Sequence, residues 1–310
     1  MSQFEAMREL LVLTEEVRQA LEAGKPVVAL ESTVITHGLP YPENLRLAQD
    51  MEQTVREQGA VPATIGVLEG AIYVGLRPDQ VETLAQMHDV HKISVRDLAP
   101  AVAMKRSGGT TVAGTLLAAS TAGLRVFATG GIGGVHRLAP GETGVSYDIS
   151  TDLTLLARTP MVVVCAGAKA ILDLPATLEL LETLGVLVVG YQTSEFPAFY
   201  SISSGLPVSV RVESAEQAAQ IARAHWGLGL DSAVLVTVPP PVEAALPHEA
   251  VEGVIETALR EVQAQGIHGQ AVSPYLLRRV SELTEGSSLQ ANLALLLNNA
   301  RVAAQIAKAI

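Results

Sequence analysis

Short apolar runs alternate with segments of helical periodicity along most of this chain. Val27–Leu30, Arg125–Ala128 and Met161–Cys165 are compact runs rich in valine and alanine, and each lies between segments that favour a helix. Strands buried on both faces read as continuous apolar runs, as in a parallel sheet covered by helices. The order therefore predicts a layered α/β fold with a mostly parallel central sheet.

The remaining elements follow the same pattern. Further strands are expected within Ala63–Val74, in two parts about Gly70, and at 186–189, 208–212 and 233–236. Helices are expected at 42–59, 78–87, 97–105, 112–122, 149–158, 175–184 and 215–226, with a helical tail at 248–265, 274–284 and 287–309. Apolar residues at helical spacing predict one more helix over Phe4–Ala23. Because no internal repeat is visible, we expect a single domain over residues 1–310.

The charge balance excludes some partners. Acidic residues number 32 against 21 lysines and arginines, a net charge of −11 without a basic stripe, so nucleic-acid binding is not expected. A small phosphorylated ligand needs only a local positive site, so this charge balance does not exclude one. Cys165 is the only cysteine, which fits a reducing compartment. No apolar run reaches about 18 residues and no signal-peptide pattern is present, so we expect a cytoplasmic protein without a membrane span.

Polar residues follow three of the predicted strands. Glu31 comes directly after the first, the glycine-rich turn Thr129–Gly134 after the second, and Lys169 after the third. In open α/β sheets, ligands bind at the carboxyl ends of the strands. We therefore expect Glu31, His136 and Lys169 to converge on one ligand site.

Lys169 stands among small apolar residues, which is unusual for a surface charge. An apolar pocket disfavours the charged amine and would lower its pKa from about 10.4 toward neutrality. A neutral amine can attack a carbonyl carbon and form an imine. The alternative is a lysine that extends from a strand end into water or pairs with Asp173.

Glu31 is a candidate general acid or base if it is partly desolvated. Its alternative role is to cap the following loop, Ser32–Thr36. The turn Gly108–Thr111 before a helix is a candidate phosphate site, with Lys92 as the matching cation. The alternative for this turn is an ordinary helix N-cap.

Asp148 and Asp152 flank a predicted helix start. They could bind Mg²⁺ or Mn²⁺ that keeps most of its waters, or they could simply favour the helix N-terminus. His136 and Arg137 stand in a glycine-rich turn, where a solvated loop would explain both. Three asparagines of the last helix could read an amide-rich base or bond to a neighbouring loop: Asn292, Asn298 and Asn299.

Taken together, several ordered segments resemble the pseudouridine-5′-phosphate glycosidase family, also called the indigoidine-synthase-A-like family. The resemblance extends from about Val28 to Ala309. The segments that carry it are Ala29–Gly38, Gly108–Val112, Phe127–Arg137, Asp148–Asp152, Val164–Asp173, Gly190–Thr193 and Asn298–Ala300.

The resemblance implies an α/β/α fold, a homotrimer and cleavage of the C–C glycosidic bond of pseudouridine 5′-phosphate to uracil and ribose 5-phosphate. It implies Lys169 as the nucleophile that becomes attached to ring-opened ribose, and Glu31 as the proton donor. The other implied contacts are Lys92, Thr111 and Val112 at the phosphate; Ser150, Thr151 and Asp152 at the substrate; His136, Asn292 and, more weakly, Thr129; and Asp148 at one largely water-ligated Mn²⁺ per subunit.

One departure from the family pattern is the loop Leu138–Tyr147, which is longer than expected and is a candidate wall of the pocket. Two other functions remain open from the residues. An aldolase-like enzyme would also use an imine at Lys169 but give other products. A non-catalytic sugar-phosphate sensor would need neither Glu31 nor Lys169.

Overall fold

One large sheet runs through the protein. The computed structural model describes residues 7–138, 141, 143–267, 269 and 272–310. Nine strands follow the order β1-β4-β3-β2-β7-β9-β13-β11-β12, while β6 pairs with β3 and β5 pairs with β6. The strands are β1 (Leu11–Leu13), β2 (Val27–Leu30), β3 (Val61–Leu68), β4 (Ala71–Val74), β5 (His91–Ile93), β6 (Gly108–Thr110), β7 (Val126–Ala128), β9 (Val162–Cys165), β11 (Leu187–Tyr191), β12 (Val210–Val212) and β13 (Val234–Thr237).

The middle of the sheet is parallel. β2, β7, β9, β13 and β11 all run in the same direction, and antiparallel pairs join β3 to β4 and to β6. Leu30 lies opposite Ala128, which lies opposite Val164. The mostly parallel sheet confirms the prediction, and this register brings the carboxyl ends of three neighbouring strands side by side.

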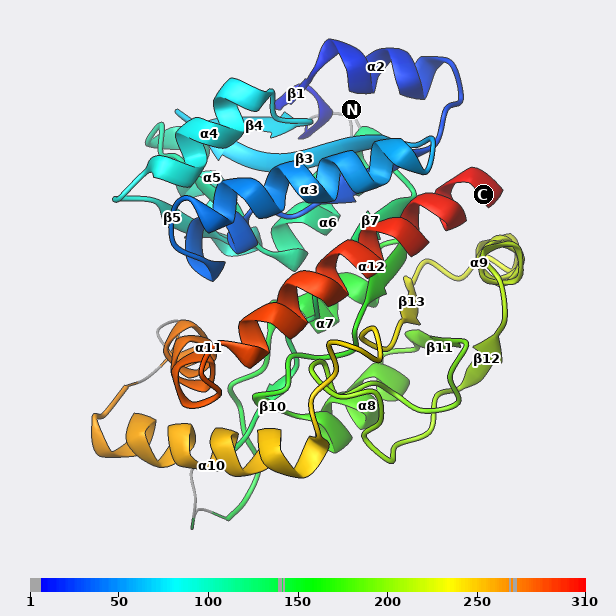
Figure 1. The fold of residues 1–310 in the computed structure, drawn as a ribbon. Coiled ribbons are helices and arrows are strands. Elements are labelled where there is room, and N and C mark those ends of the chain that lie inside the picture. The colour runs from blue at the N-terminus through cyan, green and yellow to red at the C-terminus, as the bar shows by residue number, and fades with distance from the viewer. Residues whose placement is uncertain (1–6, 139–140, 142, 268, 270–271) are drawn as a thin grey trace.

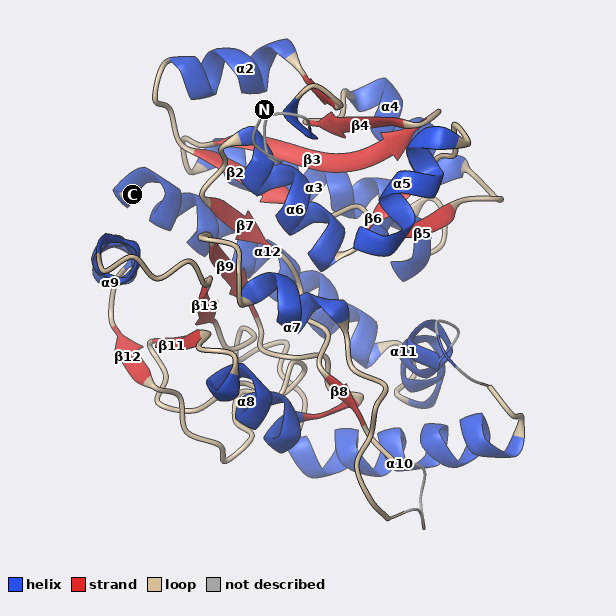
Figure 2. Ribbon diagram, turned by 180° about the vertical axis from the view of Figure 1, so that it is seen from behind, coloured by secondary structure: helices blue, strands red, loops and turns tan. Residues whose placement is uncertain are grey.

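Helices cover both faces of the sheet. Figure 1 shows α3 and α12 side by side across one face, and Figure 2 shows α6 and α7 in front of the opposite face. This arrangement confirms the layered α/β/α fold and its helical tail. The helices are α2 (Glu15–Glu22), the π-helical turn η1 (Val34–Gly38), α3 (Glu43–Glu57), α4 (Pro78–Gln86), α5 (Val95–Ala103), α6 (Val112–Ala122), α7 (Thr151–Leu156), α8 (Leu174–Thr183), α9 (Ala215–Gly227), α10 (His248–Ala264), α11 (Val272–Leu283) and α12 (Ser287–Ala309).

Small side chains explain the close packing of α6. Its sequence is Val-Ala-Gly-Thr-Leu-Leu-Ala-Ala-Ser-Thr-Ala, and most of these residues are buried. The helix packs on the sheet and also against α5 and α7. A helix that is apolar all round is stable only when it is covered on several sides, so α6 forms part of the core.

The prediction of one helix over Phe4–Ala23 was wrong within the described residues. The chain forms β1 and then α2, and Leu11 pairs in parallel with Ile72 of β4. The apolar residues of this segment fit helical spacing, but Leu10–Leu13 is also a continuous apolar run. Pairing with the sheet edge decides between the two patterns, because tertiary contacts override local propensity.

A second, two-stranded sheet lies at the carboxyl edge of the large one, and the sequence did not predict it. β8 (Val135–His136) pairs antiparallel with β10 (Leu172–Asp173), with His136 opposite Leu172. This small sheet joins the loops that follow β7 and β9. Within the described residues, no helix combines the length and apolar character needed to cross a membrane.

Candidate active site

The loops after β7 and β9 are joined by backbone hydrogen bonds. The amide of Ala166 donates to the carbonyl of Gly130 at 2.8 Å, and the amide of Lys169 donates to the carbonyl of Ile132 at 3.0 Å. Glu31 directly follows β2, the strand beside β7. Three segments that are far apart in the sequence therefore meet at one edge of the sheet.

Glu31 is a buried carboxyl group, 8% exposed, that is held by one hydroxyl. The Thr129 hydroxyl donates a hydrogen bond to its carboxylate at 2.5 Å. Burial raises the pKa of Glu31 above its usual value, although the positive charges of Lys169 and Lys92 act in the opposite direction. Burial disfavours the ionised form of a carboxylate, so Glu31 is suited to hold and deliver a proton.

Glu31 and Lys169 both line one cavity of about 860 Å³. Two other residues named from the sequence, Lys92 and Asn292, also line it. Pairing of Lys169 with Asp173 is not observed among the described residues, where the Asp173 carboxylate accepts from the amide of Ala176 at the start of α8. The cavity therefore combines a buried acid, two amines and an amide.

Lys92 lies on β5, next to β6, and is only partly exposed. Burial lowers the pKa of Lys92, and the nearby charge of Lys169 lowers it further, while Asp152 and Glu31 act in the opposite direction. The two amines and two carboxyl groups thus share one electrostatic environment. An anion bound between Lys92 and Lys169 would offset their mutual repulsion.

The turn Gly108–Thr111 is more regular than the sequence suggested. Gly108–Thr110 forms β6, and a β-carbon at Gly109 would lie 2.7 Å from the carbonyl oxygen of Ser32. Glycine is thus required where β6 passes close to the backbone of Ser32. The Thr111 side chain accepts a hydrogen bond from the amide of Gly114 at 3.3 Å and caps α6. This is the helix N-cap predicted from the sequence as the alternative for this turn.

Asp152 is a buried carboxylate that joins two elements. It accepts from the amide of Ala113 in the first turn of α6 at 2.9 Å and from the amide of Gly133 at 2.8 Å. Its negative charge therefore lies at the N-terminus of α6, where the helix dipole is positive. Val112, the first residue of α6, is buried next to it.

Ser150, Thr151 and Asp148 lie at the start of α7. The Ser150 hydroxyl accepts from the amide of Asp152 at 3.2 Å and caps α7, while Thr151 and Asp148 are exposed. Among residues 7–138, 141, 143–267, 269 and 272–310, no three His, Cys, Asp or Glu side chains gather as metal ligands. A cage of protein ligands is therefore not available there, whereas the single carboxylate of Asp148 suits a cation that keeps most of its waters.

Comparison with known proteins identifies the family. The family model described as "Indigoidine synthase A like protein" matches residues 16–309. The chain belongs to this family. It is 52% identical over 304 residues, 98% of this chain and 99% of the relative, to the pseudouridine-5′-phosphate glycosidase of Symbiobacterium thermophilum. It is 53% identical to the protein of the same name from Geobacillus kaustophilus, over 97% of this chain and 99% of that relative.

Two solved structures share the fold of this chain. The prealnumycin C-glycosynthase AlnA, in complex with ribulose 5-phosphate, is 42% identical with a TM-score of 0.88, over 97% of each chain. An indigoidine synthase A-like protein from Thermotoga maritima is 36% identical with a TM-score of 0.87, over 96% of each chain. Both likenesses extend over nearly the whole of this family member.

His136 reaches the cavity indirectly in this family member. Its Nε2 lies 3.4 Å from the hydroxyl of Ser273, a cavity residue at the start of α11. Burial lowers the pKa of His136, and the charges of Lys169 and Lys92 act in the same direction while Asp148 raises it. The imidazole is therefore neutral at pH 7 and can both donate and accept a hydrogen bond.

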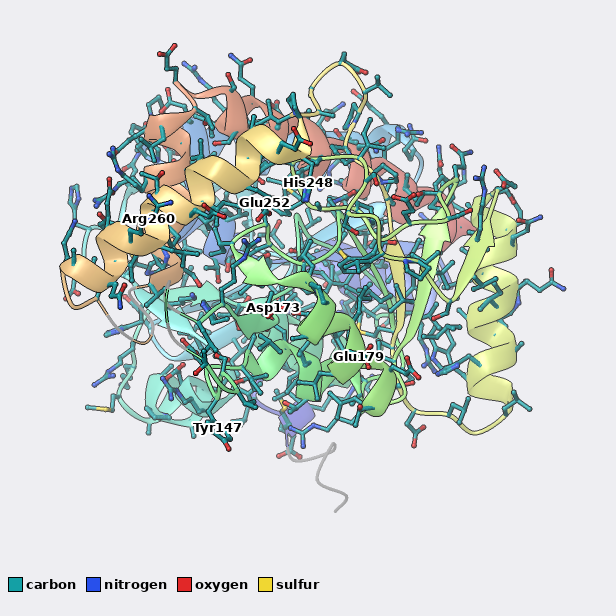
Figure 3. The ribbon with its side chains drawn as sticks, turned by 90° about the horizontal axis from the view of Figure 1, so that it is seen from below. Tyr147, Asp173, Glu179, His248, Glu252 and Arg260 are labelled. Carbon is teal, nitrogen blue, oxygen red and sulfur yellow. The ribbon has the colours of Figure 1, made fainter. Side chains whose placement is uncertain are left out.

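The loop Leu138–Tyr147 does not line the cavity with its described residues. Residues 139, 140 and 142 lie outside the described part of the chain. Val145 and Tyr147 are 75% and 91% exposed, and Figure 3 shows Tyr147 at the edge of the molecule in that view. The described part of this loop therefore faces solvent.

Several cavity residues carried no signal in the sequence. Phe199 and Tyr200 form an edge-to-face pair 4.7 Å apart in the cavity wall. His37, whose ring nitrogen lies 2.7 Å from the Thr36 hydroxyl, stood in a segment of family resemblance without an assigned role. A whole side of the cavity comes from α11 and its approach, with Ile267, Ser273, Pro274, Tyr275, Leu277, Arg278, Ser281 and Glu282. Helical periodicity alone could not reveal which face of α11 meets the cavity.

Proposed function

We propose that this chain is a pseudouridine-5′-phosphate glycosidase, which cleaves the C–C glycosidic bond reversibly to give uracil and ribose 5-phosphate. The observation that carries the proposal is the pair formed by Lys169 and the buried acid Glu31 on the wall of one cavity. The names of the relatives support the substrate. The ribulose 5-phosphate bound to AlnA supports a pentose phosphate as ligand class. A role in pseudouridine catabolism follows from this direction of the reaction.

The C–C bond explains why an amine is needed. Uracil would leave from carbon C5 as an unstable carbanion, so the two-carboxylate chemistry of ordinary glycosidases is insufficient. An amine attached to the sugar C1 supplies an electron pair for bond cleavage, because its lone pair can form a C=N bond. Lys169 is the residue we assign to this step.

The reaction then proceeds in three balanced steps. The C1–O4 ring bond opens, O4 takes a proton from Glu31, and the Lys169 amine bonds to C1 and gives a proton to the Glu31 carboxylate. Glu31 delivers this proton to uracil C5, the bond between sugar C1 and uracil C5 breaks with its electron pair returning to the uracil ring, and the Lys169 nitrogen forms the protonated imine. Water adds to the imine and releases ribose 5-phosphate with the free amine. The net reaction consumes one water.

The other residues would bind and orient the substrate. Lys92 and the Thr111–Val112 turn hold the phosphate in this proposal, while segment Ser150–Asp152 contacts the sugar. His136 and Asn292 contact the base. Asp148 would hold Mn²⁺ that keeps most of its waters, and the bound cation would supply positive charge to an anionic substrate. We further propose that the protein is cytoplasmic and forms a homotrimer. Sedimentation at several protein concentrations would test the trimer.

The first experiment measures uracil release from pseudouridine 5′-phosphate together with borohydride trapping. We expect the wild-type protein to release uracil and to gain one ribose-phosphate adduct at Lys169, and we expect Lys169→Ala to do neither. Lys92→Ala is the matched control: it removes the other cavity amine and should raise KM while the Lys169 adduct still forms.

The alternatives predict other results. An aldolase-like enzyme would form the adduct from another sugar phosphate and release no uracil. A sensor would bind the substrate without uracil release and without an adduct. Either result would overturn the proposed activity.

A further inference from the structure

Arg137 is not the solvated loop residue that its sequence context suggested. Its side chain is 20% exposed. Its Nε donates to the carbonyl of Leu172 at 2.9 Å, and its Nη2 donates to the carbonyl of Ala170 at 2.9 Å. The guanidinium group therefore binds the chain immediately after Lys169 at two points.

The same guanidinium group forms a two-pronged ion pair with Glu252 of α10. The distances are 2.6 Å from Nη1 and 2.9 Å from Nη2 to the two carboxylate oxygens. Hydrogen bonding to Arg137 lowers the pKa of Glu252, so the pair is fully charged at pH 7. Bidentate pairs of this kind fix geometry as well as charge.

Arg137 holds the turn that carries Lys169, residues 169–172, which we call the lysine turn. The amide of Leu172 donates to the carbonyl of Lys169 at 3.0 Å and closes this turn. On its inner side, the Lys169 amide is bound to Ile132. Arg137 holds the outer side, so the backbone of Lys169 is fixed between two sets of hydrogen bonds.

Glu252 connects this turn to the side of the cavity formed by α11. It lies on α10, which packs along α11, and Figure 3 labels Glu252 on α10 and Asp173 at the end of the lysine turn. The ion pair therefore joins the segment that carries the amine to the helical pair that contributes one cavity wall.

We propose that Arg137, held by Glu252, is a positioning residue that fixes the Lys169 amine for attack on the sugar. The inference rests on the proposed function only for the identity of the reaction. The placement of the turn is a property of the fold. A misplacement of about 1 Å can reduce a rate about 100-fold, so small movements of this turn have a large effect on the rate.

The test compares two arginines with similar ion pairs. Arg137→Lys keeps the charge but loses the fork that reaches two carbonyls and Glu252. Arg279→Lys is the matched control: Arg279 pairs with Glu261 at 2.6 and 2.9 Å within α10 and α11, and no hydrogen bond to the lysine turn is found for it among the described residues. We expect kcat to fall about 10- to 100-fold in Arg137→Lys with KM nearly unchanged, and to stay unchanged in Arg279→Lys.

Two further measurements separate positioning from general stability. Guanidinium ion added to Arg137→Ala should restore part of kcat, whereas it should not affect Arg279→Ala. Glu252→Gln should reduce kcat with KM unchanged, because the guanidinium group then loses its charged partner. A fall in both arginine variants, or a rise in KM alone, would overturn the proposal.

Amide hydrogen exchange tests whether Arg137 holds the lysine turn, and this measurement does not depend on enzyme activity. Exchange in a peptide covering residues 166–176 should be faster in Arg137→Lys than in wild type and unchanged in Arg279→Lys. If the wild-type protein releases no uracil, the proposed function fails while this comparison still decides whether Arg137 holds the turn. Equal exchange in all three proteins would show that Arg137 does not hold this turn.

Discussion

At the scale of single residues, the acid is held by a relay of hydrogen bonds that begins in the last helix. The Asn299 amide donates to the carbonyl of Thr129 at 2.8 Å, and the Thr129 hydroxyl donates to Glu31. Asn299 is fully buried. The position of Glu31 therefore depends on a side chain 268 residues later in the sequence.

The raised pKa of Glu31 predicts how stability and activity depend on pH. The folded state binds the proton more tightly than the unfolded state, so the contribution of Glu31 to stability is complete below its ordinary pKa of 4.5 and is lost as the pH rises through the raised value. Glutamine stays neutral, so Glu31→Gln should gain stability relative to wild type as the pH rises from 5 to 8. Wild-type uracil release should decline as the pH rises through the raised pKa of Glu31, because the proton donor ionises.

Urea unfolding of both proteins at these two pH values measures the effect. Glu252→Gln provides a control whose stability difference from wild type should stay nearly constant between pH 5 and 8. Arg137 lowers the pKa of Glu252, so its contribution is present above the unfolded pKa and is lost as the pH falls through the lowered value. An identical stability difference between wild type and Glu31→Gln at pH 5 and 8 would contradict the assignment.

Asn299 should matter more for stability than its neighbour in the sequence. Asn299→Ala leaves the buried carbonyl of Thr129 without its donor, which costs about 1–3 kcal/mol. Asn298→Ala is the matched control, because Asn298 is only partly buried and its bond to the Pro239 carbonyl is 3.4 Å long. Chemical denaturation of the two variants decides the point. Equal decreases in the free energy of unfolding would show that the buried hydrogen bond of Asn299 contributes no more than the partly buried one of Asn298.

At the scale of elements, much of the site followed from strand order alone. Glu31 and Lys169 were predicted to meet because each follows an apolar run, and the carboxyl ends of parallel strands share one edge. The role of Arg137 was not predictable, because it depends on where α10 crosses the turn. β1 was missed because the spacing of Leu11 and its neighbours fits a helix as well as a strand.

Gly109 offers a test of how closely β6 must approach the Glu31 loop. A β-carbon there would clash with the backbone of Ser32, next to Glu31, so Gly109→Ala should lower the free energy of unfolding by about 1–3 kcal/mol and reduce activity. Gly253→Ala is the matched control, because it lies within α10 with open space around it. That variant should gain up to about 1 kcal/mol from helix propensity.

Thermal unfolding and uracil release of the two glycine variants check this prediction. A Gly109→Ala protein with wild-type stability would mean that β6 can move away from Ser32 at little cost.

At the scale of the whole molecule, α12 ties the fold together. It contacts β2, β7 and β9 in the sheet as well as α3 and α9 on the same face. Asn292 on this helix also lines the cavity. Removal of α12 would therefore expose the middle of the sheet and delete one wall of the site.

We expect a variant that stops after residue 286 to lack a cooperative unfolding transition and all uracil release. The physical reason is the loss of apolar burial over the central strands. Circular dichroism during heating, with the full chain alongside, measures the transition. A truncated protein that unfolds cooperatively would show that the sheet is stable without α12.

The hydrogen-bond relay from Asn299 to Glu31 also has a consequence in time. A ribosome that has passed residue 169 has already produced the acid, its threonine and the amine, yet the residue that anchors the relay is still to be translated. No nascent chain shorter than 299 residues contains the complete arrangement. During synthesis, the chain therefore contains Glu31 and Lys169 well before Asn299, and the hydrogen bonds that order Glu31 become complete only when translation has reached the last helix.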